Sequence, residues 1–180
     1  MVRANLAHAG GIRIDHVMGL MRLWVMPAGA GPTEGAYLNY PFDDLLRLLT
    51  LEAWRRNAVV LGEDLGTVPE GLRDKLAARK LLGMRVLFFE RDNNGTFKSL
   101  DEWPDSAIAT STTHDLPTIE GWWTAHDIDW RIQVGQHREE ERPAQLEERE
   151  RERGGLLRLL REYAPSIEGD LTDPDVLADA

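Results

Sequence analysis

The chain has 180 residues, of which 42% are hydrophobic and 29% are charged, proportions typical of a folded globular domain. Its net charge of −10 argues against a nucleic-acid partner and against an anionic membrane surface, because both favour basic patches. The absence of cysteine excludes disulfides and thiolate metal sites, and no apolar run approaches the roughly 18 residues of a membrane-spanning helix, so we expect a cytoplasmic protein.

Helices and short apolar strands alternate along the first half of the chain. The pair Gly10-Gly11 separates the first helix from the first strand, and the leucines of PFDDLLRLLTLEAWRRN recur with the period of a helix. Pro69 suits the first turn of a further helix. The expected elements are a helix over 2–9, a strand over 11–15, a loop rich in Gly, Pro, Trp and Met over 17–40, a helix over 41–57, a strand over 58–64 and a helix over 68–82.

The second half contains two more apolar strands and then a long charge-rich segment. GMRVLFFE (83–90) and SAIATSTTHD (106–115) are predicted strands joined by a polar connection. Residues 137–163 mix acidic and basic side chains, with leucines near the end of the segment. This pattern predicts a solvated surface helix, although a charged interaction tail would also fit. Farther on, Thr172 or Asp173 is expected to cap another helix.

The alternation of short strands and helices predicts an α/β fold with parallel strands. Four such strands with their helices correspond to half of a (β/α)8 barrel, and the chain would begin and stop inside helices. We therefore expect residues 1–180 to form part of a barrel domain that is truncated at both ends. A half-barrel exposes apolar surface and unpaired strand edges, so self-association through that surface is expected.

Every predicted strand ends in an acidic residue. In parallel α/β proteins the active site lies beyond the carboxyl ends of the strands. The repetition therefore favours a functional site, although each acid taken alone is also explained as a helix cap or a turn residue. The acids are Asp15, Glu63 followed by Asp64, Glu90 and Asp115.

Three of these acids, Asp15, Glu63 and Asp115, suit the chemistry of a glycosidic bond. One carboxylate attacks the anomeric carbon, a carboxylic acid protonates the leaving oxygen, and a third acid stabilises the positive charge on the ring. Arg13 lies on the same side of its strand as Asp15 and would favour the ionised carboxylate that a nucleophile needs. Glu63, at the end of an apolar strand, suits the general acid. Carboxylates also bind Mg²⁺ or Ca²⁺, but these acids are scattered, so we expect no metal.

Four segments carry a resemblance to a known family: IRIDHVMGLMRLWVMP, GAYLNYPFDDLL, VVLGEDLGTVPE and TSTTHDLPTIEGWW. In this order they resemble the bacterial 4-α-glucanotransferases known as amylomaltases or disproportionating enzymes. The similarity runs from about residue 2 to the end and is strongest over 10–125. It implies a retaining enzyme of the α-amylase superclan. The chain would then be a partial catalytic TIM (β/α)8 barrel that holds about the fourth to the seventh strand.

The resemblance also implies roles for single residues. The family's nucleophile falls on Asp15, its acid/base on Glu63 and its transition-state-stabilising aspartate on Asp115. Arg13 matches the arginine that positions the nucleophile, and His114 matches a histidine that hydrogen-bonds sugar hydroxyls. The implied reaction is a double displacement that moves α-1,4-glucan segments from a maltooligosaccharide, starch or glycogen donor to a sugar 4-hydroxyl, without a cofactor or metal.

Two alternatives remain open from the sequence. An α-glucan hydrolase would use the same acids, and a non-catalytic carbohydrate-binding fragment would keep the fold without the reaction. The family's enzymes are several times longer than this chain. Because the geometry of the acids depends on a closed barrel, we expect the isolated chain to be inactive or nearly so.

Several further residues have weaker functional interpretations. Strand alternation would turn the side chain of His16 away from that of Asp15, and Asp64 is expected to cap the loop or to orient a neighbour. His8, His126 and His137 are not spaced as a metal site and are expected at the surface or in packing. Aromatic side chains that would either stack on sugar rings or pack in the interior are Trp24, Trp122, Trp123, Tyr37 and Tyr40.

Overall fold

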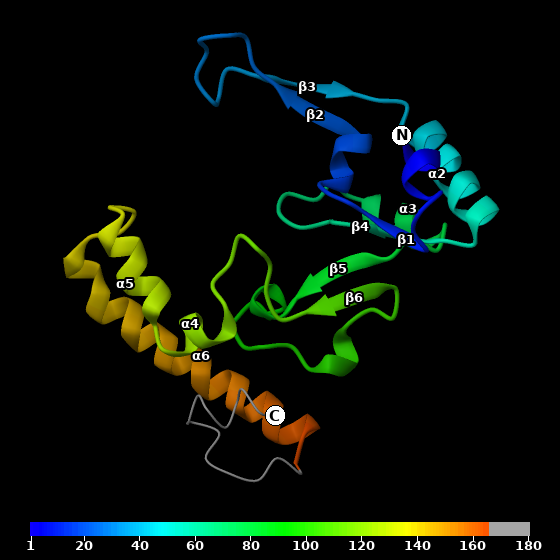
Figure 1. Cartoon of the computed structure of the whole chain (residues 1–180). Helices are drawn as coiled ribbons and strands as arrows, with labels where there is room; N and C mark the ends of the chain where they lie inside the picture. Colours follow the sequence, from blue (N-terminus) through cyan, green and yellow to red (C-terminus); the bar gives the residue numbers. More distant parts are fainter. Residues whose placement is uncertain (166–180) are drawn as a thin grey trace. The chain divides into compact units, whose positions relative to one another are not determined.

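The structure is a computed structural model, and it describes residues 1–165. The helix predicted to start at Thr172 or Asp173 lies outside the described residues. The chain divides into two compact units. The first unit consists of Met1–Arg85 with Pro104–Ala109, and the second of Val86–Trp103 with the residues from Thr110 on. Figure 1 shows the helices and strands of both units, coloured along the sequence.

Short strands form the frame of the first unit. They are β1 (Gly11–Ile14), β4 (Val59–Gly62), β5 (Gly83–Val86) and β6 (Ala107–Thr110). β1 pairs in parallel with β4 along its whole length, and a parallel bridge between Leu61 and Leu82 joins β4 to β5. β5 in turn pairs with β6. The predicted α/β fold with parallel strands is confirmed, and within residues 1–165 these strands do not close into a barrel.

Helices pack against these strands in the first unit: α1 (Val2–Asn5), α2 (Phe42–Arg56) and α3 (Leu72–Ala77). The prediction for α2 is confirmed. The helix buries Phe42, Leu46, Leu49 and Ala53, a spacing of four, three and four residues that places them on one face. It ends at Asn57, whose left-handed backbone (φ 48°) is a common helix stop. The buried core of this unit consists of Val17, Met18, Phe42, Leu46, Leu49, Ala53, Val60, Leu72, Leu76 and Leu81.

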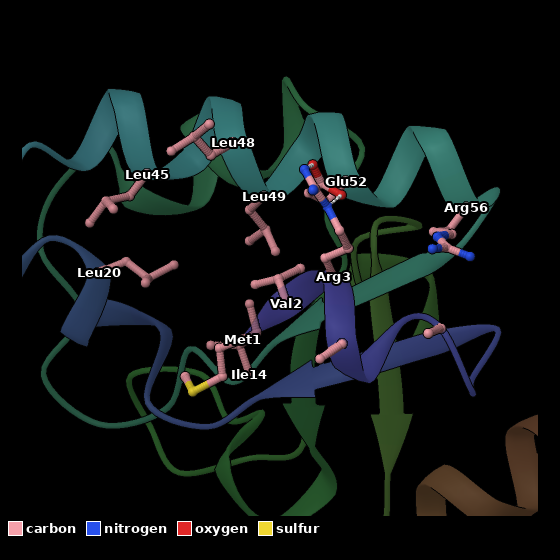
Figure 2. Close-up of a pocket in the computed structure, with 12 residues that line it drawn as sticks. Met1, Val2, Arg3, Ile14, Leu20, Leu45, Leu48, Leu49, Glu52 and Arg56 are labelled. Carbon is pink, nitrogen blue, oxygen red and sulfur yellow. Dashed lines mark hydrogen bonds and ion pairs between the residues drawn. The ribbon is translucent and has the colours of Figure 1, made fainter.

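An open apolar groove of about 810 Å³ lies between α1, α2 and the end of β1. In Figure 2, Leu45 and Leu49 point from α2 into this groove, toward Leu20 and Val2. Its polar rim includes the ion pair between Arg3 and Glu52 (2.7 Å), which holds the pKa of the Glu52 carboxyl at about 2 through the hydrogen bond from Arg3.

The loop predicted over 17–40 is not a plain loop. It begins with the 3-10 helix η1 (Val17–Leu20) and continues as an antiparallel hairpin of β2 (Arg22–Val25) and β3 (Ala36–Asn39). The prediction was wrong because the Gly and Pro residues between the two strands dominated the composition of the segment. The runs RLWV and AYLN that flank them are rich in aromatic and aliphatic side chains, which is the hairpin signal.

Several elements are shorter than the sequence predicted. The helix expected from Pro69 begins at Leu72, because Gly71 has a left-handed backbone (φ 72°) that precedes the helix. The strand predicted over 83–90 ends at Val86 and continues as the 3-10 helix η2 (Leu87–Phe89). The physical reason is that Leu87 and Phe88 pack against the core of the second unit. The strand predicted over 106–115 is likewise limited to β6, and the helix predicted over 2–9 to α1.

The second unit is helical. It contains η3 (Leu100–Glu102), α4 (Ile119–Trp123), α5 (His126–Gln133), η4 (Glu139–Glu141) and α6 (Arg142–Tyr163). The charge-rich segment forms a helix as predicted, but α6 is not only a solvated surface, because it buries Arg149, Leu156 and Leu159. Within residues 1–165, no helix is both long and apolar enough to span a membrane. The buried core of this unit consists of Phe97, Trp122, Trp123, Leu156 and Leu159.

Candidate active site

Arg13 and Asp15 form an ion pair at the end of β1. Because side chains alternate along a strand, both leave the same face of β1, whereas Ile14 between them packs against the core of the first unit. The Arg13 Nη2 atom lies 2.7 Å from Asp15 Oδ1. The placement predicted from the alternation is therefore confirmed. The Asp15 carboxylate stays largely exposed to solvent, as a group that must reach a ligand requires.

Glu63 directly follows β4, the strand beside β1. Its Oε2 atom accepts a hydrogen bond from the backbone N–H of His16 (2.8 Å), and its Oε1 atom accepts one from the backbone N–H of Leu65 (2.7 Å). The Glu63 backbone extends the pairing between the strands, since its N–H donates to the Ile14 carbonyl and its carbonyl accepts from Val17 N–H, both at 2.9 Å. The carboxylate is therefore oriented by both strand ends.

His16 contributes its backbone to this arrangement, which the sequence interpretation missed. The residue lies after β1 and has a left-handed backbone (φ 46°, ψ 62°), so the alternation argument for its side chain does not apply. A non-glycine residue in this region is uncommon and persists only where the surrounding structure holds it. Here the turn aims the His16 N–H at Glu63. Gly62 makes room for the turn, because a Cβ on it would lie 3.0 Å from Val17 Cγ2.

Asp64 is fully buried and binds three N–H donors. Its Oδ1 atom accepts from Met84 N–H (2.7 Å), and its Oδ2 atom accepts from Arg73 Nε (2.7 Å) and Arg85 Nη1 (3.1 Å). Burial alone would raise the pKa of Asp64, but the hydrogen bonds from Met84, Arg73 and Arg85 together outweigh it and hold the pKa below its usual value. The acid thus ties the loop after β4 to α3 and β5.

The lowered pKa of Asp64 predicts a pH-dependent contribution to stability. A carboxyl whose pKa is lower in the folded state stabilises the fold above its unfolded pKa of about 4, and loses this contribution as the pH falls through the folded pKa. We expect the difference in free energy of unfolding between the unaltered protein and an Asp64→Asn variant to be largest near neutral pH and to shrink in acid. Urea unfolding of both proteins from neutral pH to about pH 3 measures it. A difference that stays constant over this range would contradict the prediction.

His114 and Asp115 lie in the second unit, in the loop after β6. His114 Nε2 is 3.3 Å from Asp115 Oδ2, and both side chains are exposed. The Asp115 N–H donates to Thr113 Oγ1 (3.3 Å), and the Leu116 N–H donates to the Thr113 carbonyl (3.1 Å). Each unit thus brings together its own predicted residues: Arg13, Asp15 and Glu63 in the first, His114 and Asp115 in the second.

The other candidates divide into exposed and buried side chains. Trp24 packs edge-on against Tyr37, with ring centroids 5.0 Å apart, and its Nε1 donates to the Pro32 carbonyl; Trp24, Tyr37 and Tyr40 remain exposed. Trp122 and Trp123 are buried in the second core and are packing residues. His126 accepts a hydrogen bond from Trp130 Nε1, His137 contacts Glu141, and His8 is exposed. Within residues 1–165 no group of three or more acids and histidines is placed to hold a metal ion.

The family model and the curated relatives that match this chain all carry the same description. Residues 1–176 match the family model described as 4-alpha-glucanotransferase. The 4-alpha-glucanotransferase of Haemophilus influenzae is 38% identical over 173 residues, which cover 94% of this chain and 25% of the relative. That of Mycobacterium tuberculosis is 43% identical over 139 residues, which cover 75% of this chain and 19% of the relative. The chain thus spans about a fifth to a quarter of the length of these curated relatives.

Solved structures agree with the sequence relatives. The amylomaltase from Corynebacterium glutamicum superimposes with a TM-score of 0.83 at 36% identity, over 90% of this chain and 23% of that chain. An amylomaltase from Streptococcus agalactiae, solved in complex with acarbose, matches with a TM-score of 0.54 at 20% identity, over 76% of this chain and 28% of that chain, and supports the fold alone. The family match over nearly the whole chain, together with these relatives, shows that the chain belongs to the 4-α-glucanotransferase family.

Proposed function

We propose that the protein containing this chain is a 4-α-glucanotransferase that moves segments of α-1,4-linked glucan onto a sugar acceptor. The observation that carries the proposal is the arrangement of two carboxylates at the ends of adjacent parallel strands. Asp15 is ion-paired with Arg13 at the end of β1, and Glu63 is held by two backbone N–H groups at the end of β4. Such a pair is the core of retaining glycosidic chemistry. Membership of the family points to the same reaction.

The proposed mechanism is a double displacement. Asp15 attacks the anomeric carbon while Glu63, as an acid, gives its proton to the departing 4-oxygen, which leaves a β-linked glucosyl-enzyme on Asp15. Glu63, now a carboxylate, takes the proton from the acceptor's 4-hydroxyl as that oxygen displaces Asp15. The two inversions restore the α linkage. Arg13 balances the charge of Asp15 and fixes its direction, and the N–H groups of His16 and Leu65 orient Glu63.

Asp115 and His114 complete the proposal through the family resemblance. Asp115 would stabilise the positive charge that develops on the sugar ring, and His114 would hydrogen-bond sugar hydroxyls where the bond is cleaved. Both side chains are exposed, so they are open to a ligand. The chemistry requires no cofactor or metal. The substrates would be maltooligosaccharides or glucans derived from starch or glycogen, in the cytoplasm. Self-association through exposed apolar surface stays a prediction.

Product analysis distinguishes this proposal from its alternatives. With maltotriose as the only sugar, we expect the full-length protein to form glucose together with maltooligosaccharides longer than the substrate, because the glucosyl-enzyme passes its sugar to an acceptor. Chromatography of the products measures this. Glucose and maltose without longer chains would indicate a hydrolase. Binding of the sugar with no products would indicate a carbohydrate-binding protein. The 180-residue chain alone is expected to give little or no product.

A further inference from the structure

The backbone N–H of Leu65 binds the Glu63 carboxylate, and Asp64 is the single residue between the two in the chain. The two acidic side chains point in different directions. That of Glu63 reaches the end of β1, whereas that of Asp64 is buried toward α3 and β5. The position of Asp64 therefore sets where the chain runs immediately after Glu63.

The loop after β4 is anchored at two places, one at Glu63 and one at Asp64. On the β1 side, the Glu63 backbone makes its two hydrogen bonds to Ile14 and Val17. On the other side, Arg73 binds Asp64 twice, with Nε on the carboxylate (2.7 Å) and Nη2 on the backbone carbonyl (3.1 Å). The Arg73 clamp thus holds the backbone of Asp64 as well as its side chain, so rotation of the peptide that leads to the Leu65 N–H is restricted.

We propose that Asp64 is a positioning residue, which holds the Glu63 carboxylate in the direction needed to protonate the leaving oxygen. This inference rests on the proposed function, in which Glu63 is the acid/base. In a buried cluster the desolvation of the charges offsets much of their attraction, so the net contribution of Asp64 to stability is modest. Orientation is different, since a displacement of about 1 Å at a reacting group can cost about a hundredfold in rate.

Gly83 gives an independent way to move Asp64. A Cβ at position 83 would lie 3.0 Å from Asp64 Oδ1 and 3.2 Å from Oδ2. Met84, Arg73 and Arg85 all bind the carboxylate, so any shift away from this Cβ would lengthen at least one of these hydrogen bonds. A Gly83→Ala substitution therefore displaces the carboxylate while every charge of the cluster is kept. An Asp64→Asn substitution keeps the shape but offers one acceptor oxygen where the carboxylate offers two.

The test compares two donors that differ in their need for an acid. Cleavage of maltotriose needs a proton on the leaving oxygen, whereas fluoride leaves from α-maltosyl fluoride without one. In the full-length protein, we expect Asp64→Asn to lower the rate of maltotriose conversion by roughly tenfold or more. First-turnover fluoride release from α-maltosyl fluoride should change little. Gly83→Ala should show the same dependence on the leaving group, and it serves as the second variant where Asp64→Asn fails to fold.

Two reference variants separate positioning from general damage. Asp127→Asn removes a comparable acid from the second unit, whose side chain is only 8% exposed and pairs with Arg149. It should lower the unfolding temperature and leave the ratio of the two donor rates unchanged. Glu63→Gln should show the dependence on the leaving group in full. Equal losses on both donors for Asp64→Asn and Gly83→Ala, or no loss, would overturn the positioning role. A Glu63→Gln variant without the dependence would instead overturn the proposed function itself.

Discussion

Replacing Asp15 by asparagine is expected to lower the transfer rate of the full-length protein by on the order of 10⁴- to 10⁶-fold, about the range seen when one member of a catalytic triad is removed. An amide oxygen cannot form and release the glucosyl ester on which both steps of the proposed mechanism depend. The shape of the side chain is unchanged, and Arg13 still has an oxygen to bind. Initial rates with maltotriose as donor and acceptor measure the effect.

The control for this variant is Asp44→Asn. Asp44 lies in the first turn of α2, is 72% exposed against 74% for Asp15, and likewise pairs with an arginine, Arg47, at 3.2 Å. Its substitution should leave the rate nearly unchanged. A complementary measurement is mass spectrometry of a Glu63→Gln variant given α-maltosyl fluoride, which should show a sugar attached to Asp15. An Asp15→Asn rate as high as that of Asp44→Asn would contradict the assignment of the nucleophile.

Among the substitutions proposed for this chain, removal of the Arg149 side chain is expected to produce the largest loss of stability, about 3–5 kcal/mol in the free energy of unfolding. Arg149 is buried in α6, where Nη1 and Nη2 bind the two Asp127 oxygens at 2.6 and 2.8 Å. The guanidinium also donates to the Trp122 carbonyl and stacks 4.9 Å from the Trp122 ring centroid. An Arg149→Ala variant leaves the Asp127 carboxylate buried without its partner.

A neighbouring arginine on the same helix provides the matched control. Arg151 is 67% exposed and pairs with Glu148 one turn away, an arrangement worth at most about 1 kcal/mol. Urea unfolding of Arg149→Ala and Arg151→Ala, monitored by the fluorescence of the tryptophans of the second core, measures the difference. Equal destabilisation by the two substitutions would contradict the prediction. Replacing Arg149 and Asp127 together by methionine and leucine should recover much of the loss, because no unpaired charge then remains buried.

The local pattern of the sequence predicted those elements whose apolar side chains recur on one face. α2 was predicted within a residue at each end, because its apolar residues recur with a helical period and Asn57 stops it. The hairpin of β2 and β3 was missed, and β5 was predicted too long. Both errors concern apolar runs, whose conformation depends on the part of the fold against which they pack. Leu87 and Phe88 were predicted as strand residues, but they lie outside the strand because they pack against the second core.

At the site, the pattern of residues was sufficient to predict which groups stand at the ends of which strands. The alternation of a strand was enough to put Arg13 beside Asp15, and the motif around Glu63 was enough to put an acid at the end of the next strand. The groups that hold Glu63 in place could not be predicted in this way, because they include backbone groups from distant parts of the chain. The N–H of His16 lies 47 positions from Glu63 in the chain, and the N–H of Met84 lies 20 positions from the Asp64 that it binds. Backbone N–H groups are present at almost every residue and carry no signal in the sequence, so such partners are defined only when the strands come together in the fold.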